Sequence, residues 1–196
     1  MATPPDFTAG AVLTAAQMNA VGRWKMTPTS ISGTGATIDA DGTINVAGTG
    51  AFTVNGCFTS DFKQYEIIAR LKTATGGCQL QMQMTTGGTP ATTTDYYYVV
   101  GYTSYAGAWN KTAANNTFMQ FGAAFNTYGS LITADISYPQ QADYTLMTTN
   151  SNGWGGSGDE QAITWNHHRL ATAYDGFKMT PSSSTLTGEL RIYGYN

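Results

Sequence analysis

Apolar and polar residues alternate with a period of two along most of this chain. The longest run is 184–196, in which Leu186, Leu190 and Ile192 fall on one face and Glu189 and Arg191 on the other. An alternation of this length predicts a half-buried β-strand. Because sheet pairing is what orders a segment near a chain end, we expect strands from earlier in the chain to flank it.

Shorter alternating runs recur before it at roughly ten-residue spacing, with turn-forming residues between them. We expect strands around residues 37–40, 43–46, 51–54, 65–72, 78–84, 96–100, 119–125, 132–138, 144–148, 163–167 and 177–179. Asp41-Gly42 joins the first two as a hairpin. Segments 86–94, 101–117 and 150–159 are expected to be connections. The pattern predicts an all-β fold, a single antiparallel β-sandwich of the jelly-roll kind, over residues 25–196.

Residues 1–24 have a different pattern and predict an extended N-terminal arm with one short helix. Thr14 can cap the helix and Gln17 can close a capping box, while Leu13 and Met18 occupy the two positions of a hydrophobic staple. Gly22 is placed to end the helix. About two turns do not persist unaided in water, so the helix must dock, either on its own domain or on another subunit.

Composition excludes two classes of function. The net charge is -3, and Lys and Arg are scattered singly, so there is no basic stripe for nucleic acid. No apolar run is long enough to insert into a membrane, and the first residues lack the features of a signal peptide. Charged residues make up only 11% of the chain, against about 25% in an ordinary soluble domain. Such a surface is typical of rigid β proteins that are secreted or carried on particles.

The candidate chemical groups do not form a catalytic or metal site. Cys57 and Cys78 are expected to be free buried thiols, with a bridge between them as the alternative. His167 and His168 are adjacent on a strand and point to opposite faces, so they cannot ligate one ion. Residues 39–42 resemble the start of a calcium loop, but its twelfth position is Gly50, where glutamate is required. We expect no catalytic residue, no metal and no cofactor.

Aromatic residues in the predicted connections are the best candidates for contact with a ligand or partner. They lie among Gly, Ser and Asn and are Tyr102, Tyr105, Trp109 and Trp154. Aromatic faces beside amides and hydroxyls suit a sugar-binding surface and equally a protein interface. The alternative is that these large side chains fill the ends of the sandwich.

Two segments resemble proteins of tailed-bacteriophage virions. Residues 6–19, Asp-Phe-Thr-Ala-Gly-Ala-Val-Leu-Thr-Ala-Ala-Gln-Met-Asn, are similar to the amino-terminal segment of many of these proteins. Residues 176–195 are similar to the closing strand pair of phage fibre, tail-tip and decoration proteins. That pair usually ends on Thr/Ser-Gly-x-x-x-x-Tyr-Gly, matched here by Thr187, Gly188, Tyr193 and Gly194. The two segments together span about a fifth of the chain, and residues 25–175 carry no such resemblance.

The resemblance implies a non-enzymatic virion protein, commonly a homotrimer, in a tail fibre or tail tip. Its arm of residues 1–24 would bind other virion proteins, with the anchor residues Phe7, Leu13, Thr14, Gln17 and Met18. The connections in 95–160 would contact a host-surface glycan or a neighbouring subunit. The particle would assemble in the host cytoplasm and be released by lysis. Two alternatives stay open: a capsid decoration protein (head fibre or cement), and a free lectin-like glycan-binding module.

Overall fold

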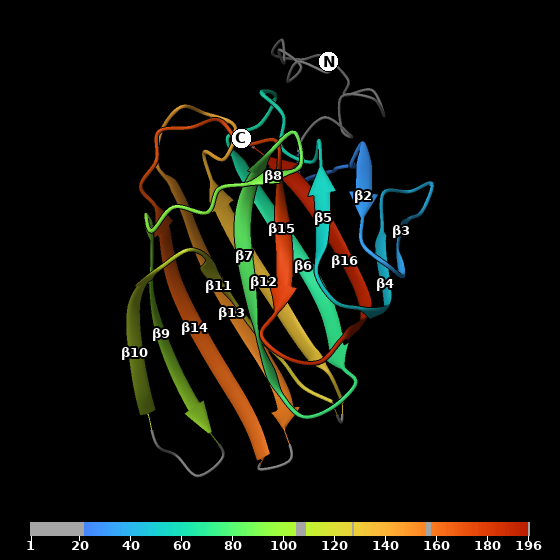
Figure 1. The fold of residues 1–196 in the computed structure, drawn as a ribbon, viewed down its shortest axis with the longest axis vertical. Coiled ribbons are helices and arrows are strands. Elements are labelled where there is room, and N and C mark those ends of the chain that lie inside the picture. Colours follow the sequence, from blue (N-terminus) through green and yellow to red (C-terminus); the bar gives the residue numbers. More distant parts are fainter. Residues whose placement is uncertain (1–21, 105–108, 127, 156–157, 196) are drawn as a thin grey trace, which may run out of the picture.

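The computed structural model describes residues 22–104, 109–126, 128–155 and 158–195. Within these residues the chain forms two β-sheets packed face to face, one of 10 strands and one of 6 (Figure 1). Every pairing between the named strands is antiparallel. The all-β, jelly-roll-like sandwich predicted from the alternation is confirmed.

The two sheets draw strands from all parts of the described chain. The order in the large sheet is β10 (Trp109–Asn116), β9 (Tyr96–Ser104), β14 (Gly158–His168), β13 (Thr145–Gly155), β12 (Ser130–Ser137), β6 (Gln64–Thr73), β16 (Leu186–Tyr195), β4 (Ile44–Thr49) and β3 (Ala36–Ile38), with β1 (Trp24–Lys25) also on β16. The order in the small sheet is β11 (Met119–Ala124), β7 (Cys78–Thr86), β15 (Gly176–Pro181), β5 (Phe52–Asn55) and β2 (Ser30–Ser32), with β8 (Thr89–Pro90) also on β7.

β16, the strand predicted from the longest alternation, lies inside the large sheet. It pairs with β6 along its whole length, and with β4 and then β1 on its other side. Its apolar residues face the small sheet and are fully buried. Gly188 (φ +145°) is required here, because a Cβ atom would lie 2.0 Å from the Arg70 carbonyl oxygen of β6. β15 and β16, the two strands of the closing phage-like segment, belong to different sheets.

The core fills the space between the sheets. The large sheet contributes Ile44, Val46, Tyr65, Ile67, Leu71, Ile132, Ile136, Leu190 and Ile192, and the small sheet contributes Phe52, Val54, Leu80, Met82, Met84, Phe121, Phe177 and Met179. Both cysteines are buried and free, as predicted, and burial raises the pKa of the Cys57 thiol. The apolar lining extends only part of the way across the large sheet. On β13 and β14 the inner face becomes polar, with Thr145, Thr149, Ser151, Thr164 and Asn166 all buried.

Two segments predicted as connections are strands. The chain over 101–117 completes β9 and forms β10, and 150–159 completes β13 and begins β14. Gly and Asn are weak strand formers, which explains the wrong prediction. In the structure, both segments form cross-strand pairs, such as Asn110 with Tyr102 and Asn150 with Ile163. Cross-strand pairing here overrides local propensity.

The hairpin predicted at Asp41-Gly42 connects β3 and β4. The Asp41 carboxylate accepts hydrogen bonds from the Thr43 amide at 2.9 Å and from the Lys25 ammonium at 2.7 Å. These bonds hold the pKa of Asp41 far below its usual value. The Asp39 amide donates to the Thr43 carbonyl at 2.8 Å. The acidic residues of this segment therefore serve the hairpin, as predicted.

Several predicted features fall outside the described residues. These are the short helix, the anchor residues Phe7, Leu13, Thr14, Gln17 and Met18, and Tyr105. Within the described ranges, no helix combines the length and apolar character needed to cross a bilayer. In the same ranges, no three His, Cys, Asp or Glu side chains come together as a metal site.

Candidate ligand-binding groove

A groove of about 400 Å³ lies where the large sheet extends past the edge of the small one. Edge strand β11 packs over β13 and β14, while β9 and β10 continue beyond it (Figure 1). The groove therefore has two walls, the inner face of β9 and β14 and the free side of β11. Its lining residues are Gly77, Cys78, Gln79, Tyr98, Val100, Tyr102, Gln120, Gly122, Ala123, Phe125, Glu160, Ala162 and Thr164.

The register of β9 and β14 places the lining residues of the first wall on one face. Tyr102 pairs with Ala162, and Val100 pairs with Thr164. Directly opposed residues of an antiparallel pair point to the same side, and so do residues two apart on a strand. Tyr98, Tyr102, Thr164 and Glu160 therefore share the inner face. The Tyr98 ring stacks on the Phe118 ring with centroids 6.1 Å apart, which restricts its orientation.

Asn166 ties β11 to this wall. Its Oδ1 accepts from the Gln120 amide at 2.8 Å, and its Nδ2 donates to the Gln120 carbonyl at 3.2 Å and the Met147 carbonyl at 3.4 Å. Asn166 and Gln120 are both buried. The side-chain amide thus occupies the backbone groups that β11 would otherwise offer to another strand at this point.

The Gln120 side chain is held in a fixed orientation beside the groove. The pairing of β11 with β7 is interrupted by a bulge between Gln120 and Gly122. Nε2 of Gln120 donates to the Gly122 carbonyl at 2.7 Å. Oε1 is buried and has no hydrogen-bond partner among the described residues. Because the Gly122 carbonyl only accepts, this geometry leaves Oε1 as an acceptor.

Two threonines on neighbouring strands add hydroxyl groups. Thr164 of β14 and Thr149 of β13 are directly paired and fully buried. Neither Oγ1 has a hydrogen-bond partner within the described part of the chain. Only Thr164 lines the groove.

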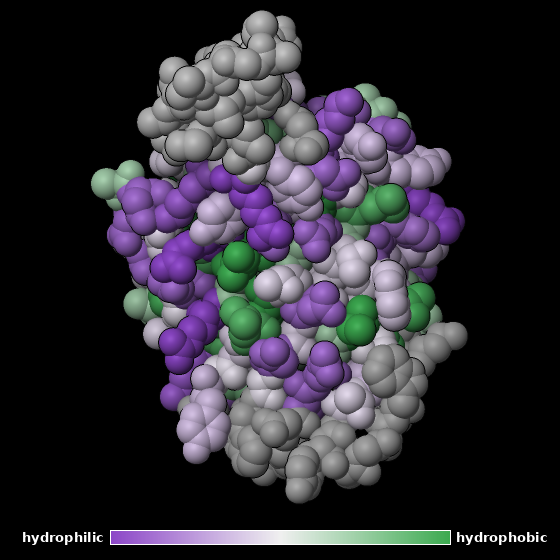
Figure 2. Space-filling model, turned by 180° about the vertical axis from the view of Figure 1, so that it is seen from behind, coloured by the Kyte–Doolittle hydropathy of each residue, from purple (hydrophilic) through white to green (hydrophobic). Residues whose placement is uncertain are grey.

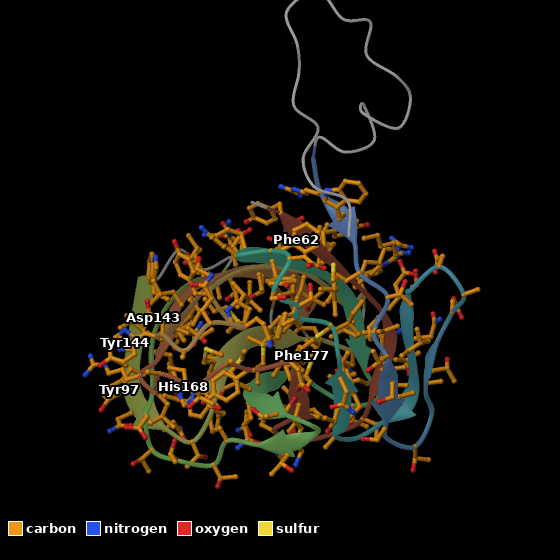
Figure 3. All side chains as sticks on the ribbon, turned by 90° about the horizontal axis from the view of Figure 1, so that it is seen from above. Phe62, Tyr97, Asp143, Tyr144, His168 and Phe177 are labelled. Atoms are coloured by element: carbon orange, nitrogen blue, oxygen red, sulfur yellow. The ribbon has the colours of Figure 1, made fainter. Side chains whose placement is uncertain are left out.

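The far end of the β9–β14 inner face is closed by three stacked or bonded rings. The Tyr96 and His168 rings stack with centroids 3.8 Å apart, and His168 Nε2 lies 2.6 Å from the Tyr174 hydroxyl. The Tyr96 hydroxyl accepts from the Met84 amide at 3.0 Å and donates to the Ala91 carbonyl at 3.1 Å. Figure 3 shows His168 between the sheets and Tyr97 on the outside. As predicted, His167 and His168 face opposite sides of the sheet.

The outer face of the large sheet carries a second, flatter surface. Trp165, Leu146 and Tyr144 are about half exposed there. The Arg169 guanidinium lies 4.0 Å from the centre of the Tyr97 ring. Figure 2 shows this face, on which hydrophobic residues are interspersed with hydrophilic ones. No described strand covers it.

Three of the four predicted contact residues, Tyr102, Trp109 and Trp154, lie in strands at the same end of the large sheet. Tyr102 lies in the groove and is 36% exposed. Trp109 pairs through its backbone with Thr103 beside it, and Trp154 pairs with Asp159 at the same end of the sheet. The side chains of the two tryptophans lie outside the described part of the structure. Sequence reasoning missed Tyr98, Gln120 and Thr164, and it considered Glu160 only as a candidate acid, not as a contact residue. The alternation of Tyr96, Tyr98, Val100 and Tyr102 could have indicated the aromatic wall, whereas nothing local marked the others.

No protein-family model matches this chain, and no curated protein matches it. Among solved structures it aligns with the SPRY domain of human HERC1 at 10% identity and a TM-score of 0.37, over 87% of this chain and 98% of that one. It aligns with the C-terminal CBM6 of LamC, a laminarinase from the marine Zobellia galactanivorans, at 12% identity and a TM-score of 0.31, over 87% and 98%. It aligns with a Bacillus licheniformis β-glucanase at 11% identity and a TM-score of 0.29, over 89% and 99%.

These comparisons correct one prediction, that the chain is not an enzyme. Catalytic domains of glucanases are among the structures with which the chain aligns, including an endo-1,3-β-glucanase domain from Thermotoga petrophila over 84% of this chain. At these identities and TM-scores, the alignments assign neither an activity nor a ligand to this chain.

Proposed function

We propose that this chain binds a carbohydrate in the groove between β11 and the inner face of β9 and β14. The observation that carries the proposal is the composition of its walls: the aromatic side chains Tyr98 and Tyr102 face amide, hydroxyl and carboxylate groups. Aromatic faces pack against the C–H faces of a sugar ring, and the polar groups bind its hydroxyls.

The free edge of β11 favours this ligand over an extended peptide. A peptide that added a strand to the small sheet would need the outward N–H and C=O groups of β11. Those of Gln120 already bond to Asn166. A sugar needs no strand edge and can use the side chains of the groove.

We further propose that the chain is a homotrimeric fibre or tail-tip protein of a tailed-phage virion, attached through residues 1–24 and binding a host-surface glycan. The resemblance of residues 6–19 and 176–195 supports this setting. The positions of the first described strand and of the groove, at opposite ends of the large sheet, agree with this setting. Trp24 and Lys25 pair with Gly194 and Tyr193 at one end, whereas Tyr102 and Glu160 lie at the other (Figure 1). A protein held at the first end presents the groove outward.

A binding experiment with two matched variants tests the carbohydrate proposal. Full-length protein is titrated calorimetrically with dextran, mannan and laminarin, and reducing ends are measured in the same mixtures to detect hydrolysis. Tyr102→Ala removes an aromatic side chain from the groove, and Tyr144→Ala removes one from outside it. We expect binding to at least one polysaccharide, weakened about tenfold or more by Tyr102→Ala alone, because full burial of a large apolar side chain contributes about 1.5–3 kcal/mol. Absence of binding, or equal effects of both variants, would contradict the proposal.

Antibody labelling of virus particles tests the second proposal. Label on the tail supports a fibre or tail-tip protein. Label on the head supports the alternative, a capsid decoration protein. Unlabelled particles together with retained sugar binding support a free lectin-like module.

A further inference from the structure

We infer that the groove is specific for uncharged sugars and that Thr164 and Gln120 accept hydrogen bonds from their hydroxyl groups. This inference rests on the proposed function and specifies the ligand class for the same groove. Two independent observations carry it: the charge of the lining and the unpartnered oxygens beside it.

The charge of the lining selects against acidic sugars. Glu160 carries the only formal charge among the described lining residues, which include no Lys, Arg or His. A uronate or sulfate in this groove would lose hydration, would find no counter-ion in the lining, and would lie near a carboxylate of the same sign. Burying a charge without a partner is strongly unfavourable. An uncharged sugar avoids this cost, and its hydroxyls can donate to Glu160.

Two side-chain oxygens of the lining, Gln120 Oε1 and Thr164 Oγ1, lack hydrogen-bond donors in the part of the chain that the structure describes, and a ligand can provide them. Gln120 is 4% exposed, and its Oε1 has no partner among the described residues because its amide nitrogen is held by Gly122. Thr164 is 0% exposed, and its Oγ1 likewise has none within the described chain. Buried polar atoms are usually satisfied, and here both residues line the same groove. Sugar hydroxyls supply the missing donors, and they also accept from Thr164.

The acceptors are held in place before a ligand arrives. Asn166 fixes the backbone of Gln120, and the Gly122 carbonyl fixes its side chain. Thr164 has a β-branched side chain with restricted χ1 and lies in a strand paired on both sides. Pre-organised groups lose little conformational freedom on binding. The groove can therefore distinguish ligands by their donors.

Two measurements on full-length protein test the inference. The first compares affinity for uncharged dextran, mannan and laminarin with affinity for the uronates alginate and polygalacturonate at one ionic strength. We expect uncharged polymers to bind and uronates to bind at least tenfold more weakly. Glu160→Gln should narrow that difference, because it removes the like charge and keeps the shape of the side chain.

The second measurement uses a matched pair of isosteric variants. Thr164→Val and Thr149→Val each delete a buried hydroxyl that makes no hydrogen bond in the free protein. Neither should lower the melting temperature. Only Thr164→Val should weaken binding, by about five- to tenfold, as expected for the loss of one hydrogen bond. If Thr164 had only a structural role, Thr164→Val and Thr149→Val would bind the polysaccharide with the same affinity.

The outcomes separate this inference from the proposed function. If none of the five polysaccharides binds, the proposed function fails and the inference fails with it. If uronates bind as tightly as the uncharged polymers, or if Thr164→Val and Thr149→Val bind equally, carbohydrate binding stands and the inference is overturned. Preference for an uncharged polymer together with a selective loss in Thr164→Val supports it.

Discussion

The side-chain amide of Asn166 on β14 bonds to both the N–H and the C=O of Gln120 on β11. One residue of the large sheet thereby takes the place of a neighbouring strand at the edge of the small sheet. This contact joins the two sheets next to the groove and positions the Gln120 side chain in it.

Removing this contact should destabilise the sandwich. Asn166→Leu leaves the buried backbone N–H and C=O of Gln120 without partners, and an unpaired buried group costs about 1–3 kcal/mol. We expect the free energy of unfolding, measured by urea denaturation, to fall by about 3 kcal/mol. Asn150→Leu on β13 is the control, because Asn150 is exposed. Equal stability of the two variants would show that the contact contributes little.

Burial of His168 should make stability depend on pH. Desolvation lowers the pKa of His168, although the carbonyl and charge of Asp95 oppose this shift. The unfolded chain therefore binds a proton at higher pH than the folded chain, so stability is retained above the ordinary histidine pKa of about 6.5 and lost as pH falls below it. Urea titrations between about pH 8 and about pH 5, a range that brackets this pKa, measure how the free energy of unfolding depends on pH. His168→Phe should remove most of this slope.

His167 provides the control for that experiment. Its pKa is also lowered, by desolvation and by the charge of Arg169, but it is only partly buried. His167→Gln should therefore leave most of the slope in place. A slope that follows His167 instead would contradict the role assigned to His168.

Arg23 should hold β1 on the large sheet. Its guanidinium pairs with the carboxylate of Glu66, whose side chain is 9% exposed, whereas Arg23 itself is 57% exposed. Arg23→Ala leaves a nearly buried carboxylate without its counter-ion, and we expect a loss of about 1–2 kcal/mol in unfolding free energy, moderated by the exposure of the arginine. Arg191→Ala breaks a pair with Glu189 in which both side chains are more than 40% exposed. It should cost under about 0.5 kcal/mol. A larger loss of unfolding free energy in Arg191→Ala than in Arg23→Ala would contradict the role assigned to Arg23.

The arm of residues 1–24 is tested by Leu13→Asp. A charge at the staple position should prevent docking of the short helix expected there and abolish incorporation into virus particles. The melting temperature of the sandwich should not change. Leu13→Met keeps the apolar character and serves as the control. Normal incorporation of Leu13→Asp would remove the anchor proposal.

The sequence predicted the sandwich because burial on one face of a strand imposes a period of two. The inner residues of β16 and the hairpin at Asp41-Gly42 follow from such local rules. The extension of β13 through Gly153 does not, because it depends on cross-strand pairing with Glu160 of β14, which overrides the weak strand propensity of Gly and Asn. The groove shows the same division. Tyr102 was recognised because it is an aromatic residue in a segment rich in Gly, Ser and Asn. The contact between Gln120 and Asn166 joins residues 46 positions apart and has no local signature.

The most direct test is an NMR titration of isotope-labelled full-length protein with fragments of the tightest-binding uncharged polysaccharide. If the ligand binds in the groove, amide resonances of Gly122 and Ala123 on β11, together with those of Val100 and Tyr102 on β9, will shift in a saturable way, while those of Leu146 and Thr148 near the outer face of β13 will stay unchanged. Saturable shifts at Leu146 and Thr148 without shifts on β11 would place the ligand on the opposite face of the sheet and contradict binding in the groove.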